Sequence, residues 1–222
     1  KKLQKAIPDF YGKEDITFHE LNSDFIATFD LFLKTEAGLC RNTIVRYMKC
    51  FKRITNMALA KEWMRKDPFY GYKMAQDETD PVFLTYPELK SIMEKEFTIP
   101  RLALVRDIFV FAAFTGLAFA NVSTLTKDNL VQDNNGDWWI RKGRVKLERR
   151  HRASSVCNIP LLPVPLAILK KYEEHPICRE KSLCLPVICN QRMNSYLKEI
   201  ADLCNIRKNL TTHTAKHSKI YI

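Results

Sequence analysis

Apolar residues in the first third of the chain recur at the spacing of amphipathic helices. Asn22 or Ser23 can cap a helix that ends before the stop signal Glu36-Ala37-Gly38. Its apolar residues, three and four positions apart, are Phe25, Ile26, Phe29, Phe32 and Leu33. A longer helix is expected to begin with Asn42 as its cap, and a short one to cover residues 67–74. The apolar stripe of the longer helix comprises Ile44, Tyr47, Met48, Phe51, Ile54 and Met57 or Ala58. The pattern predicts an all-helical N-terminal domain.

The polar, acidic residues 76–83 interrupt this pattern, and we interpret them as a linker. Beyond them, Thr85-x-x-Glu88 is a capping box that opens a helix as far as Lys95. Residues 99–115 predict a strongly apolar helix that is buried on most sides.

The periodicity then changes from that of helices to that of strands. The turn signal at residues 134–136 precedes a short strand over 138–140, and a second strand is expected over 156–159. Helical spacing returns over residues 163–174 and 191–204. The chain is therefore expected to be mainly α-helical with a small antiparallel β-sheet. The expected domains are residues 1–75, a linker over residues 76–83, and residues 84–222.

The charge of the chain restricts the class of partner. Its 222 residues include 36 Lys and Arg against 25 Asp and Glu, a formal net charge of +11. Such a surplus favours a polyanion, and nucleic acid is the commonest one, although an anionic membrane surface would also attract the chain.

Membrane insertion, secretion and metal binding find little support in the sequence. Arg106 and Asp107 break the longest apolar run, and the first residues lack the apolar stretch of a signal peptide, so we expect a cytoplasmic protein. The seven cysteines form no C-x-x-C pair, and Cys178, Cys184 and Cys189 match no zinc spacing. Buried thiols are the simpler interpretation, and neither a metal nor another cofactor is expected.

Two clusters of basic residues are candidates for contact with phosphates. The face of the second helix opposite its stripe carries Arg41, Arg46, Lys49, Lys52 and Arg53. Residues 141–152, which include Arg141, Lys142 and Arg144, hold seven basic side chains against one acid, between the two expected strands. Either cluster can be merely solvated, but in a chain of this charge we predict that both contact DNA.

A third segment combines an imidazole with an ammonium group. His213 and Lys216 are three positions apart in Leu210–His217, so in a helix they share one face and can point at the same phosphate. Alone, such a pair is usually an ordinary surface pair.

Several short motifs together resemble the tyrosine recombinase (phage integrase) family, in particular integrases of Bacteroides-type mobile elements. In the first domain the motifs are Ile16-Thr17-Phe18-His19-Glu20-Leu21, Asn42-Thr43 followed by Tyr47, and Lys66-Asp67-Pro68-Phe69. In the second they are Phe83-Leu84-Thr85, Phe114-Thr115-Gly116-Leu117-Ala118-Phe119, Ile159-Pro160-Leu161-Leu162, Asn190-Gln191-Arg192-Met193-Asn194 and Leu210-Thr211-Thr212-His213. The resemblance covers essentially residues 1–217.

The resemblance implies a fold and a reaction. The fold is a helical SAM-like core-binding domain joined to a catalytic domain. In the reaction, a tyrosine attacks a DNA phosphodiester and forms a 3′-phosphotyrosyl link, with neither metal nor nucleotide. Two arginines, a hairpin lysine and the histidine of a His-x-x-Arg motif support it. Asn42 and Thr43 join the candidate DNA contacts on this basis.

Transferring the family's roles residue by residue reveals departures from its pattern. Lys146 stands at the hairpin lysine and His213 at the motif histidine. Lys216 replaces the motif arginine, which removes a bidentate fork. Ala118 stands where the first arginine normally follows Thr-Gly-Leu. Relatives in Bacteroides-type elements often read Thr-Gly-Leu-Ala too, and Arg106 or Arg101 could compensate for the loss.

The role of the nucleophile has two interpretations. Tyr221, in Ile220-Tyr221-Ile222, is either the nucleophile, with intervening residues absent from the sequence, or an ordinary tail residue of a chain that is truncated before the nucleophile.

Three functions follow from these observations. The first is a recombinase acting on double-stranded DNA, as four protomers on two duplexes and as a monomer when free. The alternative is a catalytically impaired DNA-binding relative that acts as an accessory recombination protein. A helical RNA-binding or membrane-surface protein would account for the charge alone.

Overall fold

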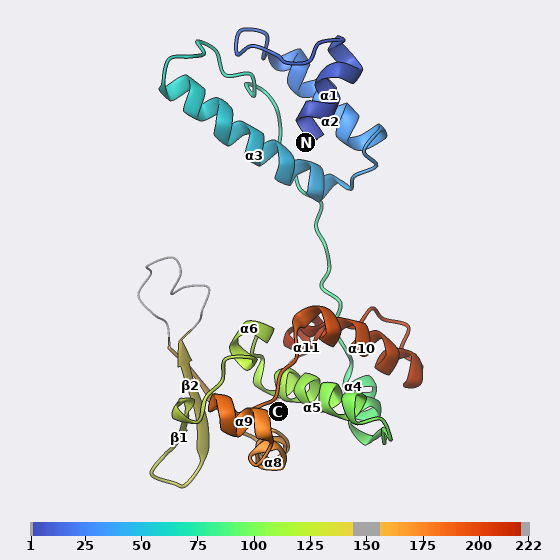
Figure 1. Cartoon of the computed structure of the whole chain (residues 1–222), viewed down its shortest axis with the longest axis vertical. Helices are drawn as coiled ribbons and strands as arrows, with labels where there is room; N and C mark the ends of the chain where they lie inside the picture. The colour runs from blue at the N-terminus through green and yellow to red at the C-terminus, as the bar shows by residue number, and fades with distance from the viewer. Residues whose placement is uncertain (1, 144–155, 219–222) are drawn as a thin grey trace. The chain divides into compact units, whose positions relative to one another are not determined.

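The computed structural model describes residues 2–143 and 156–218. They form a mainly helical fold with one three-stranded antiparallel sheet, which confirms the expected fold class (Figure 1). The chain divides into two compact units, residues 1–79 and residues 80–222, and each unit has its own hydrophobic core.

The first unit is entirely helical in its regular structure. Its helices are α1 (Lys2–Tyr11), α2 (Ser23–Thr35) and α3 (Arg41–Ala60). Asn22 caps α2, because its side-chain oxygen accepts a hydrogen bond of 2.8 Å from the backbone N–H of Phe25. The ring of Phe51 on α3 lies edge-on to the rings of Phe29 and Phe69, with centroids 5.8 and 5.6 Å apart. Aromatic side chains therefore join the helices of this unit.

The expected start of α3 is wrong. Cys40 is the N-cap and Asn42 lies inside the first turn. The Asn42 side chain does not cap the helix because it bonds the backbone of Asp77 instead.

The expected stripe of α3 is wrong at Ile54 in its second half, and of the alternatives Met57 and Ala58 the second is confirmed. Ile54 and Met57 are about half exposed, at 50% and 52%, whereas Thr55 and Ala58 are buried. After Phe51, the buried face of α3 is therefore formed by the smaller side chains of Thr55 and Ala58.

No helix forms over residues 67–74. The carboxylate of Asp67 accepts a hydrogen bond of 2.9 Å from the backbone N–H of Phe69, and Tyr70 N–H donates to the Asp67 carbonyl. These local bonds close a turn in place of the expected helix.

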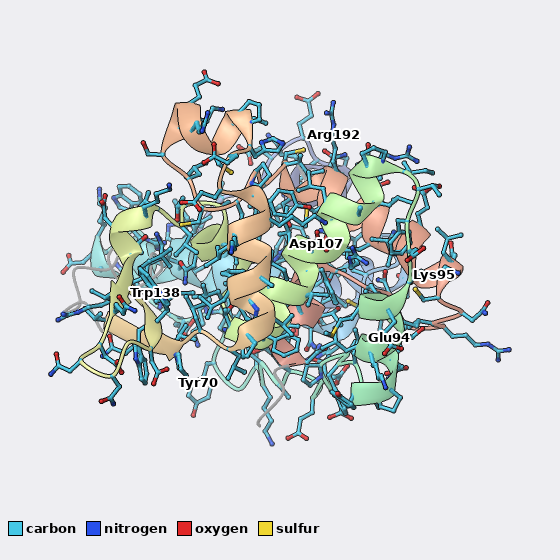
Figure 2. All side chains as sticks on the ribbon, turned by 90° about the horizontal axis from the view of Figure 1, so that it is seen from below. Tyr70, Glu94, Lys95, Asp107, Trp138 and Arg192 are labelled. Carbon is cyan, nitrogen blue, oxygen red and sulfur yellow. The ribbon has the colours of Figure 1, made fainter. Side chains whose placement is uncertain are left out.

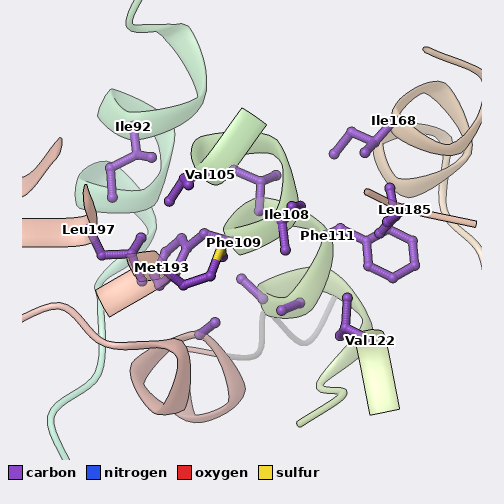
Figure 3. Close-up of a cluster of buried hydrophobic side chains, with 14 of the residues drawn as sticks. Ile92, Val105, Ile108, Phe109, Phe111, Val122, Ile168, Leu185, Met193 and Leu197 are labelled. Carbon is purple, nitrogen blue, oxygen red and sulfur yellow. The ribbon is translucent and has the colours of Figure 1, made fainter. Parts of the chain in front are cut away.

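One buried helix organises the second unit. This helix, α5 (Pro100–Thr115), buries ten side chains and ends at Gly116, whose φ of 65° suits glycine. The helices packed against it are α4 (Tyr86–Glu94), α8 (Pro163–Tyr172), α10 (Asn190–Leu203) and α11 (Thr212–His217). Phe109 faces Met193 and Leu197 of α10, and Phe111 lies beside Leu185 (Figure 3). The expected buried helix and its glycine stop are confirmed.

The start of α4 is also as expected. The Glu88 carboxylate accepts hydrogen bonds of 2.7 and 2.9 Å from the backbone N–H and the hydroxyl of Thr85. This confirms the predicted capping box.

The sheet of the second unit contains both expected strands and one more. The order is β1 (Leu130–Gln132), β2 (Trp138–Gly143) and β3 (Val156–Pro160), with antiparallel pairing throughout. Ile140 pairs with Leu130 and Ile159 and is fully buried. The described part of the unit also contains three short elements: α6 (Phe119–Val122), the 3₁₀ turn η1 (Lys127–Asn129) and α9 (Pro176–Lys181).

Candidate nucleic-acid interface

Helix α11 displays three nitrogen-bearing side chains on its outer face. His213, Lys216 and His217 are all exposed. The rings of His213 and His217 have centroids 4.5 Å apart, as expected for positions i and i+4. His217 was not among the predicted site residues, although its spacing from His213 could have indicated it.

The first turn of α11 is held by side chains of α10. The backbone N–H of Thr212 donates 2.8 Å to Oδ1 of Asn194, and its hydroxyl donates 2.8 Å to Oδ1 of Asn190. Thr211 caps the helix and accepts from the N–H of Thr214. Both asparagines belong to the motif that was noted in the sequence.

The last turn of α11 is held by the segment that directly precedes α4. The buried hydroxyl of Ser218 donates 2.8 Å to the carbonyl of Thr214 and accepts 2.7 Å from the backbone N–H of Leu84. Because both ends are fixed and Ala215 is buried, the outer side chains stand on a rigid backbone.

The short helix α6 begins beside α11. Phe119 of α6 lines one small cavity together with Thr212 and Ala215 of α11. Ala118 is the N-cap of α6, and its methyl group offers a phosphate neither charge nor a hydrogen-bond donor.

The two arginines suggested as replacements are engaged elsewhere. Arg106 donates from Nε to Asp107 at 2.6 Å and from a terminal nitrogen to the carbonyl of Lys95 at 2.8 Å. Arg101 donates to both carboxylate oxygens of Glu199, at 3.1 and 3.2 Å. Both guanidinium groups are therefore already engaged within the second unit.

Neighbouring cations on β2 point to opposite faces of the sheet. Lys142 donates 2.5 Å to the carbonyl of Thr124 and 2.9 Å to Oδ1 of Asn129. Arg141 is exposed on the other face. Arg144, Lys146 and Tyr221 were also predicted as site residues, and they lie outside the described residues.

On α3, Arg46 and Lys49 are exposed, whereas Arg41, Asn42 and Thr43 are half-buried. Lys49 makes one exposed hydrogen bond of 3.0 Å to Gln76. Of the predicted contacts on this helix, Arg46 and Lys49 are therefore the most accessible to a ligand.

Thr43 lies against the cap of α3. Its hydroxyl is 3.2 Å from Sγ of Cys40, and hydrogen bonds from Thr43 lower the pKa of the Cys40 thiol.

No group of three potential metal ligands occurs within residues 2–143 and 156–218.

Membrane insertion has no structural counterpart in the described ranges, where every helix is too short or too polar to cross a bilayer.

Comparison with known proteins assigns the first unit to a domain family. Residues 1–74 match the phage integrase SAM-like domain. No curated protein sequence matches the chain.

Several solved structures share the fold across nearly the whole chain. The Tn1549 transposon integrase, in complex with circular intermediate DNA, has a TM-score of 0.69 at 17% identity, over 91% of this chain and 72% of its own. The lambda integrase dimer, bound to a COC′ core site, has a TM-score of 0.70 at 13% identity, over 97% and 74%. The XerH site-specific recombinase, in a post-cleavage complex with difH, has a TM-score of 0.66 at 16% identity, over 98% and 64%. The chain therefore has the fold of tyrosine recombinases.

Proposed function

We propose that this chain binds double-stranded DNA and acts as a site-specific recombinase that cuts and rejoins it. The observation that carries the proposal is the outer face of α11, where His213 and Lys216 stand together on a helix fixed at both ends. Three proteins that share the fold were solved in complexes with DNA or a DNA site. The net charge of +11 suits the same partner.

The proposed reaction is a transesterification at phosphorus. A tyrosine, for which Tyr221 is the candidate, passes its phenolic proton to His213 while its oxygen forms a bond to phosphorus and the bond to the 5′ oxygen breaks. Lys146 supplies the proton to that leaving oxygen. His213 and Lys216 bind the non-bridging oxygens, whose negative charge is greatest in the transition state. A 5′ hydroxyl of another strand reverses the steps, so the bond energy is conserved.

DNA binding is proposed to involve both units. Arg46 and Lys49 of α3 and Arg141 of β2 are exposed cations that can contact phosphates, and Arg144 is a further candidate. A lambda integrase tetramer was solved on a Holliday junction. By analogy, four copies of this chain would act on two duplexes, and the free chain would be a monomer.

A covalent trap tests this proposal. A nicked duplex that loses its 5′ fragment after cleavage should accumulate a protein–DNA adduct that survives denaturation. Tyr221→Phe should abolish the adduct, and His213→Ala should reduce it by at least 100-fold. Absence of any adduct from a folded chain that binds the duplex would exclude cleavage.

A second function has its own support. Ala118 lacks the charge of an arginine, and Arg101 and Arg106 are both committed to other contacts. These observations favour a DNA-binding relative without cleavage, which assists recombination by other proteins. Such a protein would bind the duplex with a steep salt dependence and give no adduct.

A further inference from the structure

Arg41 was predicted to contact DNA, yet its guanidinium is bonded within its own unit. Nε donates 3.2 Å to the carbonyl of Ala75, and one terminal nitrogen donates 3.2 Å to the carbonyl of Lys73. The other terminal nitrogen donates 3.2 Å to Oδ1 of Asp30 on α2. All three nitrogens of the guanidinium therefore have acceptors in the first unit.

Asn42, the next residue, holds the same segment further along. Its amide nitrogen donates 3.0 Å to the carbonyl of Asp77, and its side-chain oxygen accepts 2.9 Å from the backbone N–H of Asp77. A paired contact of this kind fixes both the position and the direction of the backbone at residue 77.

Asp30 anchors the other end of the segment. The Tyr72 hydroxyl donates to the Asp30 oxygen that also accepts from Arg41. Burial, together with this bond, raises the pKa of Tyr72 to about 12. The hydroxyl thus stays a donor at every physiological pH, and the segment is held from Tyr72 to Asp77.

We propose that Arg41 and Asn42 are positioning residues, which clamp residues 72–77 against α3 and fix the point where the chain leaves the first unit. On this helix, Arg46 and Lys49 would then make the contacts with DNA, because their side chains are exposed. A phosphate would have to compete with two carbonyls and a carboxylate for the Arg41 fork, whereas Arg46 makes no hydrogen bond or ion pair to any described residue.

The clamp has a consequence for binding by two tethered units. While the Arg41 and Asn42 contacts hold, the free connector between the two units consists of residues 78–82, which are all exposed. Phe83, the next residue, already packs under the ammonium of Lys208 in the second unit. Loss of both the Arg41 and the Asn42 contacts extends the free connector to residues 75–82, because Met74 still packs on the core of the first unit. The longer loop lowers the effective concentration of the second unit at the DNA by roughly twofold.

Limited trypsin digestion tests the clamp without DNA. The scissile carbonyl of Lys73 is the one bonded to Arg41. Arg41→Lys keeps the charge but loses the fork, and Asn42→Ala removes only the Asp77 contact; each should speed cleavage after Lys73 by roughly tenfold. Arg46→Lys makes the same chemical change on the same helix without touching the segment, and it should leave that rate unchanged. Equal rates in all four proteins would overturn the proposal.

DNA binding by the whole chain tests the assignment of roles, and this part rests on the proposed function. Arg46→Ala should reduce the slope of log affinity against log salt by roughly 0.9, the loss of one phosphate contact. Arg41→Ala should leave that slope unchanged, and its combination with Asn42→Ala, which also frees Asp77, should weaken binding by roughly twofold through the longer connector. A slope reduced equally by both single variants would make Arg41 a phosphate contact and refute its positioning role. If neither the parent nor any variant binds DNA, the proposed function is refuted. The digestion rates still show whether Arg41 and Asn42 hold residues 72–77.

Discussion

The hydroxyl of Tyr172 on α8 donates a hydrogen bond of 2.8 Å to the carboxylate of Asp107 on α5, and the two helices pack together. Figure 2 labels Asp107 on α5. The same carboxylate accepts 2.7 Å from Lys171 and 2.6 Å from Arg106. Asp107 is only 5% exposed, so its charge is buried but compensated by two cations and a hydroxyl. Burial and the bond to Asp107 raise the pKa of Tyr172 above its usual range. One carboxylate thus joins α5 to α8 beneath the second unit's surface.

Asp107→Asn should lower the free energy of unfolding by about 3 kcal/mol, because it leaves two cations without their buried partner. Tyr172→Phe should cost about 1 kcal/mol, since it removes one hydrogen bond. Urea unfolding of the two variants measures both effects. Asp128→Asn changes an exposed carboxylate and serves as the control. A loss at Asp107 no larger than that of the control would show that the network does not stabilise the fold.

Glu88 predicts a dependence of stability on pH. Burial raises the pKa of this carboxyl, but bonds from Lys208 and Thr85 outweigh it and hold the pKa below its usual value of 4.5. Since the folded pKa is lowered, the stabilisation is complete above the usual value and is lost as pH falls through the folded pKa.

Glu88→Gln should therefore cost about 1 kcal/mol near neutral pH and almost nothing in strong acid. Unfolding midpoints of the variant and the parent from pH 7 to pH 2 measure this convergence. Lys90→Gln, an exposed change on the same helix, should lower stability little at any pH. A difference between Glu88→Gln and the parent that persists in strong acid would contradict the pH dependence.

The sequence predicted the elements whose signals are local. The Thr85–Glu88 capping box, the apolar run that ends at Gly116 and the strand at Trp138 depend on neighbouring residues, and all three were found. Asn42 was taken for a helix cap because its real partner, Asp77, is distant in the sequence. Helix α1 was missed because Pro8 interrupts a short polar segment.

The candidate site was predictable in its residues but not in their partners. The spacing of His213 and Lys216 placed both on one helix face. Nothing local could show that Arg106 donates to the carbonyl of Lys95, or that Lys142 turns toward Thr124. Contacts of this kind depend on tertiary packing, so a charged residue in a sequence says little about whether its charge is free.

Substitutions of the adjacent residues Arg141 and Lys142 should have different effects on DNA binding and on stability. Arg141→Ala should reduce the salt slope of DNA binding by roughly 0.9, because its exposed guanidinium is available to a phosphate. Lys142→Ala should leave the slope nearly unchanged and lower stability by about 1 kcal/mol, since its ammonium holds Thr124 and Asn129. Binding titrations at several salt concentrations, with unfolding curves, check both. A larger change of slope for Lys142 than for Arg141 would reverse this assignment.

Lys216→Arg tests whether α11 faces the reacting phosphate. The ammonium of Lys216 is exposed and makes no hydrogen bond or ion pair to any described residue, so a guanidinium fits there without displacing a partner. Its planar fork can bind two non-bridging oxygens where lysine binds one, and a lost contact of this type costs about 3 kcal/mol in the transition state.

Because lysine already supplies part of that contact, the arginine variant should raise the rate of adduct formation on the nicked duplex by roughly tenfold. Lys216→Met should lower the rate by at least as much, with DNA affinity changed by less than about threefold in both variants. Lys198→Arg, an exposed lysine on α10, is the matched control and should leave the rate unchanged. If Lys216→Arg and Lys216→Met both cleave at the parental rate, Lys216 does not touch the phosphate, and the charge that replaces the missing arginines must come from elsewhere in the chain.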